Sequence, residues 1–142
     1  TDLQIALNWT DTKVDAFNPD IVSATKVRQL EDNLPSTRGS ITLNHEIEDW
    51  RLQLRGNLYG SFYEAHLDDG TLPIEAGSSF TVDMEVGYRW SENLDLVFGA
   101  QNMFDTYPDD NPYAGIVGAK YPVTSPFGFN GGFYYWRARY SF

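Results

Sequence analysis

Two short acidic stretches contain the residue types from which binding sites and catalytic centres are built. The first, "EAHLDD", places Glu64, His66, Asp68 and Asp69 within six residues. Carboxylates and imidazoles of this kind can ligate a divalent cation. Nothing in the stretch fixes a ligand geometry, so a solvated acidic loop is the favoured interpretation, and we predict no metal site and no cofactor.

The second stretch, "YPDDNPYAG", is bracketed by two prolines that stiffen the backbone around its polar side chains. A rigid loop of this composition suits contact with a ligand, and it also suits a plain turn with solubilising charges; the sequence does not decide between them. The candidates for contacting a small ligand in the two stretches are Asp109, Asp110, Asn111, Tyr113, Glu64, His66 and Asp68.

Other chemical motifs are weaker. Asp83 and Glu85 lie on one side of an alternating segment, as the carboxylates of a glycosidase would, but the polarity of that side explains them more simply. The run "GFNGG" lacks the Lys-Ser/Thr of a phosphate-binding loop, and no Ser-His-Asp order is evident. His45 is interpreted as a strand residue, and we predict no enzyme.

These candidates are set among six segments in which apolar and polar residues alternate, the pattern of half-buried β-strands. In the fourth, "FTVDMEVGYRW", every second residue from Phe80 to Trp90 is apolar. At about 3.3 Å per residue, the longer segments can cross a bilayer when tilted. The six predicted strands span 3–9, 40–47, 51–62, 80–90, 94–102 and 131–142.

The connections between these strands alternate in length. Tight polar turns are predicted at "EDWR" and "SENL", whereas 15–39, 64–79 and 105–132 are long. Within the first long connection, "SATKVRQLEDNLP" is compatible with a helical turn because Val27 and Leu30 are three residues apart. Short turns at one end and long loops at the other are typical of bacterial outer-membrane barrels.

Composition narrows the class of protein. The chain has 142 residues, a net charge of −10 and no cysteine, which excludes disulfides and argues against a nucleic-acid partner. It starts at Thr1 without a signal peptide, so we expect it to begin partway through a longer chain. A soluble β-sandwich would bury the same faces, but aromatic residues gather at the strand ends and favour a membrane. These are Trp9, Phe62, Phe80, Tyr88 and Trp90.

The run "NMFDTY" at 102–107, followed by a long loop and a last strand ending in phenylalanine, resembles the C-terminal end of TonB-dependent outer-membrane receptors. The family pattern reads N-L-F-D-x-x-Y; here Met103 stands in place of the leucine and Tyr107 comes one place early. The segments 17–35 and 59–74 are similar to loops of that family, so the resemblance covers essentially the whole chain.

The resemblance implies an all-β fold, with residues 1–142 forming about six transmembrane strands at the C-terminal end of a 22-stranded antiparallel barrel. It implies a location in the outer membrane of a Gram-negative bacterium and contact with its lipid. The plug domain and the N-terminal strands are absent from this sequence, as is the N-terminal region through which such receptors contact TonB.

The function that the resemblance implies is uptake of a scarce nutrient, with iron-siderophore complexes first among small ligands. Oligosaccharides or other organic ligands are the second expectation, and a soluble β-sandwich binding module is the alternative from another class.

The end of the chain resembles the signal that the barrel-assembly machinery recognises in this class of protein. That signal has a terminal phenylalanine with aromatic or apolar residues at every second position before it. The corresponding residues are Tyr134, Trp136, Ala138, Tyr140 and Phe142. The alternative is a last lipid-facing strand with no role in recognition.

Overall fold

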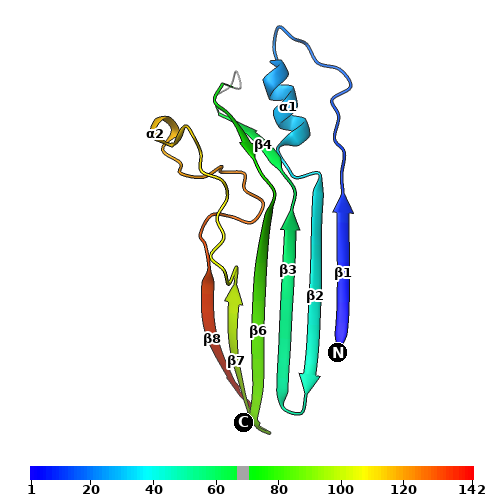
Figure 1. Cartoon of the computed structure of the whole chain (residues 1–142), viewed down its shortest axis with the longest axis vertical. Helices are drawn as coiled ribbons and strands as arrows, with labels where there is room; N and C mark the ends of the chain where they lie inside the picture. Colours follow the sequence, from blue (N-terminus) through cyan, green and yellow to red (C-terminus); the bar gives the residue numbers. More distant parts are fainter. Residues whose placement is uncertain (67–70) are drawn as a thin grey trace.

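A computed structural model describes residues 1–66 and 71–142. Figure 1 shows a long sheet with smaller elements gathered at one end. Six antiparallel strands form the sheet in the order β1-β2-β3-β6-β7-β8. They are β1 (Asp2–Trp9), β2 (Thr37–Ile47), β3 (Trp50–Tyr59), β6 (Ser79–Ser91), β7 (Leu94–Gln101) and β8 (Phe133–Tyr140). All six predicted strands are therefore confirmed.

The six-stranded sheet is open. Within the described residues, β1 pairs only with β2 and β8 pairs only with β7, so these two strands are the edges. The predicted antiparallel β class is confirmed, and closure into a barrel is not seen in this chain.

The predicted third strand is too long. It ends at Tyr59 because the chain turns out of the sheet at Gly60, whose N–H donates to the carbonyl of Thr37. A side chain at Gly60 would meet that carbonyl oxygen at 3.0 Å. Phe62 instead begins β4 (Phe62–Ala65), which pairs with β5 (Pro73–Ala76) in a second sheet. Its ring is buried there, so its assignment to the aromatic strand ends was wrong.

The first long connection contains a full helix rather than one helical turn. Helix α1 (Ala24–Asp32) is capped at its N-terminus by Ser23, whose hydroxyl accepts a hydrogen bond from the Lys26 N–H at 3.1 Å. The helix stops at Asn33, two residues before Pro35. A second, shorter helix, α2 (Ala114–Val117), lies in the last long connection and was not predicted.

The hydrophobic core lies at the end of the molecule where the long connections meet. We call α1, β4, β5 and residues 105–132 the loop cap (Figure 1). Helix α1 packs on β4: the Gln29 amide donates to the Ala65 carbonyl at 3.1 Å, and the Arg28 guanidinium lies 4.1 Å from the Tyr63 ring centre. The buried apolar residues of the cap include Val27, Phe62, Tyr63, Ala65, Ile74 and Ala76.

The short turns lie at the end opposite the loop cap (Figure 1). Glu48 and Asp49 join β2 to β3, and Glu92 and Asn93 join β6 to β7. The predicted alternation of short and long connections is thus confirmed. The long connections, however, fold together into one packed unit instead of forming separate loops.

Candidate functional site

One face of the six-stranded sheet carries nearly all of its apolar side chains. Residues directly opposite each other in antiparallel strands share a face, so the pairing register shows which side chains lie together. We call this side the apolar face. One of its rows crosses all six strands through Leu3, Leu43, Leu54, Met84, Ala100 and Tyr134.

The apolar face is uncovered. Within the described residues, α1 packs on β4 and β5 pairs with β4, and none of these three elements packs on the six strands. Ile5, Leu7 and Trp136 are therefore 72%, 75% and 81% exposed. Exposed apolar side chains on neighbouring strands form a contiguous patch, and such patches on proteins often mark contact with a membrane or a partner.

Aromatic residues mark both ends of the apolar face. At the turn end, Trp50 lies 4.5 Å from Tyr88, ring centre to ring centre, and Tyr88 lies 6.1 Å from Trp90. At the cap end are Trp9 and Phe80, each more than half exposed. The chain's four tryptophans, at positions 9, 50, 90 and 136, all belong to this face and are all exposed.

The opposite side, which we call the polar face, is tied together by side chains that reach across a strand. Arg51 on β3 passes over Gly87 of β6 to reach Asp95 on β7 at 3.1 Å. Tyr135 on β8 likewise lies over Gly99 and donates its hydroxyl proton to Glu85 at 2.6 Å. At Gly99 a Cβ would collide with the Tyr135 ring, so this crossing requires a glycine; at Gly87 a Cβ would lie 3.1 Å from the Arg51 guanidinium, a tight contact.

The two carboxylates considered for a glycosidase are both engaged by neighbours on the polar face. Asp83 accepts hydrogen bonds from the Asn57 amide at 3.0 Å and from the Asn102 N–H at 2.8 Å. Glu85 accepts from Tyr135 and lies 3.3 Å from the Arg137 guanidinium. The geometry of these two residues is that of sheet-stabilising polar groups.

Glu64 is an anchor inside the loop cap, although the sequence had suggested it as a ligand contact. Its side chain is 2% exposed. Its carboxylate accepts hydrogen bonds from the N–H groups of Val123 at 3.2 Å and Thr124 at 2.8 Å, and from the Thr124 hydroxyl. Nε2 of His66 lies 3.1 Å from the same carboxylate. Glu64 thus fixes the last long connection onto β4.

Asn111 completes this junction. It is 4% exposed and its amide donates to the Ala119 carbonyl at 3.0 Å, while its Nδ2 lies 3.5 Å from Nε2 of His66. The Tyr113 N–H donates to Oδ1 of Asn111 at 2.9 Å, which closes a turn. The structure therefore brings Glu64, His66 and Asn111 together, as a packed joint between two connections.

The remaining loop candidates do not form a shared site. Asp109 accepts a hydrogen bond from the Gly77 N–H at 2.7 Å and so holds two connections together. Asp110 is exposed, with Lys120 at 4.0 Å. Asp68 lies outside the described residues. In the described part of the chain, no three His, Asp or Glu side chains gather as metal ligands would.

The run at 102–107 forms the turn that ends β7. Asn102 has φ of 48°. Its side-chain amide donates to the Thr106 carbonyl at 2.7 Å, and its Oδ1 accepts from the Thr106 N–H at 3.0 Å. Asp105, also with positive φ, accepts from the Gly132 N–H at 2.8 Å, where β8 is about to begin. A hydrogen bond to Asp105 raises the pKa of Tyr107. These residues hold the two ends of the last long connection together, next to the ends of β7 and β8.

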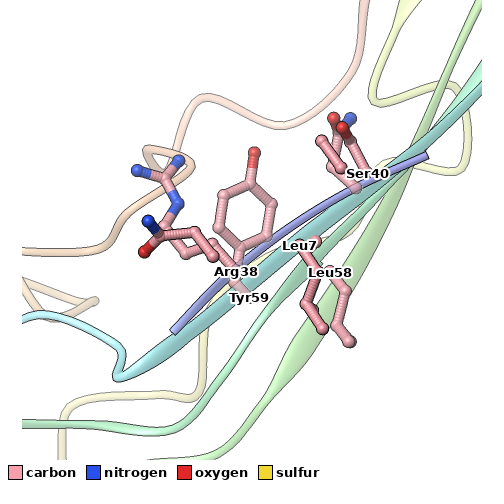
Figure 2. A pocket seen from close by; sticks show the side chains of 9 residues that line it. Leu7, Arg38, Ser40, Leu58 and Tyr59 are labelled. Carbon is pink, nitrogen blue, oxygen red and sulfur yellow. The ribbon is translucent and has the colours of Figure 1, made fainter. Parts of the chain in front are cut away.

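A hollow lies on the sheet beside the loop cap, lined by residues of β1, β2 and β3 that sequence analysis did not single out. Figure 2 shows Arg38, Ser40 and Tyr59 on one side of the ribbon and Leu7 and Leu58 on the other. Arg38 lies 5.1 Å from the Tyr59 ring centre. For Arg38, Ser40 and Tyr59, the only sequence signal was their position on the polar side of a strand near its cap end.

The last strand is an edge whose outer backbone is unpaired within the described residues. Tyr134, Trp136 and Tyr140 lie on the apolar face and are exposed. Phe142 follows the strand, fully exposed, with its ring 5.1 Å from Tyr140. Ala138 shares their face opposite Leu96. The predicted single aromatic stripe is confirmed, and its role in assembly stays a prediction.

Comparisons of this chain with protein-family models, curated proteins and solved structures gave no match. No helix in the described residues is long and apolar enough to cross a membrane.

Proposed function

We propose that this chain forms part of the wall of an antiparallel β-barrel in the outer membrane of a Gram-negative bacterium. In this proposal the barrel belongs to a TonB-dependent receptor that takes up a scarce nutrient. One observation carries the proposal: the register of six strands collects the apolar side chains on a single, uncovered face.

A bilayer accounts for both faces of the sheet. Hydrocarbon chains would cover the apolar face, and the aromatic residues at its two ends suit the lipid–water boundaries. The polar face, with its ion pairs and amides, would line the aqueous interior. The sheet edges at β1 and β8 would each need a neighbouring strand, because hydrocarbon leaves no partner for an unpaired backbone N–H or carbonyl.

Two further features support a receptor over another kind of barrel. The loop cap is a folded unit with its own core, at the end where extracellular loops would lie. The resemblance of 102–107 and of the final strand to TonB-dependent receptors falls on residues with a clear structural task, the turn after β7 and the edge strand β8.

A soluble β-sandwich is the competing proposal. It would need a second sheet stacked on the apolar face, whereas in the described residues β4 of the two-stranded sheet packs on α1 and neither of its strands packs on the six strands. A membrane wall therefore explains the exposed apolar side chains of the sheet better than a soluble sandwich does.

Protease protection in lipid vesicles tests this proposal. The natural polypeptide that carries these residues is folded into vesicles and treated with proteinase K. We expect fragments containing β2–β3 and β6–β7 to survive and cleavage to fall in the loop cap. A polypeptide that stays in the aqueous phase, folded and monodisperse without detergent, would refute the proposal.

A further inference from the structure

The linings of three neighbouring hollows overlap to form a track next to the loop cap. Of the sheet residues in these linings, Leu7, Gly39 and Leu58 belong to the apolar face and the others to the polar face. The first is the hollow of Figure 2; it shares Asn8 and Arg38 with a second hollow beside α1, and Asn57 and Tyr59 with a third beside β7. Their volumes are about 530, 620 and 400 Å³, each of the size of an ordinary small-ligand site.

The pairing register explains why the track is continuous. Asn8, Arg38, Tyr59 and Ser79 form one row across β1, β2, β3 and β6. Ala6, Ser40, Asn57 and Thr81 form the adjacent row. Strands lie about 4.8 Å apart, so four strands hold the row over about 14 Å. We call this surface, with the parts of the second and third hollows that adjoin it, the amide track.

Neutral polar groups dominate the lining of the amide track, and several are unoccupied. In the described part of the chain, the side chains of Gln101 and Asn130 form no hydrogen bond with the protein, and both are exposed. Asn57 uses only its Nδ2, toward Thr81 and Asp83, which leaves its carbonyl oxygen free. These amides offer paired donors and acceptors to a hydroxyl-rich ligand.

Aromatic rings accompany the amides. Tyr59 and Phe127 lie 5.2 Å apart, ring centre to ring centre, and Phe133 lines the same third hollow. The faces of such rings carry partial negative charge and attract the weakly positive C–H groups of a sugar ring. Planar rings next to unoccupied amides are the combination that a saccharide needs.

The charges of the amide track argue against other ligand classes. Arg38 is its one cation, and it forms no ion pair within the described residues. A polyanionic ligand would need several cations, and Asp83 and Glu31 would repel it. A wholly apolar ligand would leave the amides without partners, at a cost for each one.

We propose that the amide track binds a neutral, linear oligosaccharide, with sugar units following the row from the α1 side to β7. This inference rests on the proposed function, because it places the ligand on the aqueous side of the barrel wall. Of the two ligand classes that the sequence suggested, iron-siderophore complexes and oligosaccharides or other organic ligands, the residues of the track favour an oligosaccharide.

Titration calorimetry in detergent tests the inference on the natural polypeptide that carries these residues. The probes are maltohexaose, cellohexaose and xylohexaose, with ferric citrate as an anionic iron complex. We expect at least one hexasaccharide to bind and ferric citrate not to compete with it. Tyr59→Ala and Asn130→Ala should each weaken that binding about tenfold, the loss of one good contact.

The variants separate binding from folding. Asn130 is exposed and makes no hydrogen bond with the described residues, so its replacement leaves the fold unchanged. Tyr88→Ala, on the apolar face, should leave sugar affinity unchanged. No binding of any hexasaccharide, or equal binding by wild type and both track variants, would overturn the inference. Insertion into vesicles is measured separately from sugar binding. A failure of the sugar-binding test therefore does not count against the membrane proposal.

Discussion

Adjacent residues on a single strand meet opposite environments in this protein, and Gln53 and Leu54 illustrate the contrast. Gln53 lies on the polar face, opposite Glu85. Leu54 lies on the apolar face between Leu43 and Met84. If the faces are assigned correctly, the two positions should differ in how well they tolerate a charged side chain.

We predict that Leu54→Arg destabilises the protein in a bilayer by about 2 to 4 kcal/mol, because it places a cation in hydrocarbon near the middle of β3. Gln53→Arg, one residue away, should have an effect near zero, since the new guanidinium would face the Glu85 carboxylate. Urea titration of the lipid-folded polypeptide measures both. Equal destabilisation by the two variants would show that the faces are assigned wrongly.

Glu64 shows a different residue-scale effect. Its loss would leave the N–H groups of Val123 and Thr124 without their acceptor. We predict that Glu64→Ala destabilises the loop cap by about 1 to 3 kcal/mol. Hydrogen exchange of those two amides should speed up in proportion. Asp110→Ala is the matched control, because Asp110 is exposed and lies as far as 4.0 Å from its ion partner Lys120; exchange as fast as in Glu64→Ala would refute the anchoring role.

At the scale of elements, the alternation of side chains was sufficient to find all six strands, because each strand separates an apolar face from a polar one. The end of β3 was missed because Phe62 keeps the same parity as Leu58, although the chain has already left the sheet at Gly60. Alternation shows on which face of a strand a side chain lies. It does not show to which sheet the residue belongs.

The loop cap was beyond reach from sequence for another reason. The contacts that build it join residues far apart in the chain, such as Glu64 with Thr124 and Asp109 with Gly77. The favoured interpretation of the first acidic stretch as a solvated loop was wrong for Glu64, whose burial depends on those distant partners. Side chains suited to binding a ligand are equally suited to binding backbone N–H groups.

The terminal strand carries a prediction of its own. If the stripe ending at Phe142 is recognised during assembly, deletion of Phe142 should lower the amount of protein at the cell surface well below that of Trp9→Ala. Trp9 is a comparable exposed aromatic on the same face. As packing residues alone, either would contribute at most about 1.5 to 3 kcal/mol. Surface labelling compares the two, and equal abundance would assign β8 no role beyond its place in the sheet.

At the scale of the whole molecule, the described structure has two parts with different sources of stability. The loop cap has a buried core of its own, whereas none of the other described helices and strands packs on the apolar face of the sheet. Lipid is the proposed cover for that face. The amide track lies where the two parts meet, so a ligand there would touch strands and loops together.

The four tryptophans provide the most direct measurement, because all of them lie on the apolar face and none on the polar face. The polypeptide is folded into vesicles of ordinary lipid and into vesicles whose acyl chains are brominated, and tryptophan emission is compared. If the apolar face contacts hydrocarbon, most of the emission is lost in brominated lipid, while acrylamide added to the water quenches little. Equal emission in the two lipids, together with strong quenching by acrylamide, would contradict the proposal that this sheet is a membrane wall.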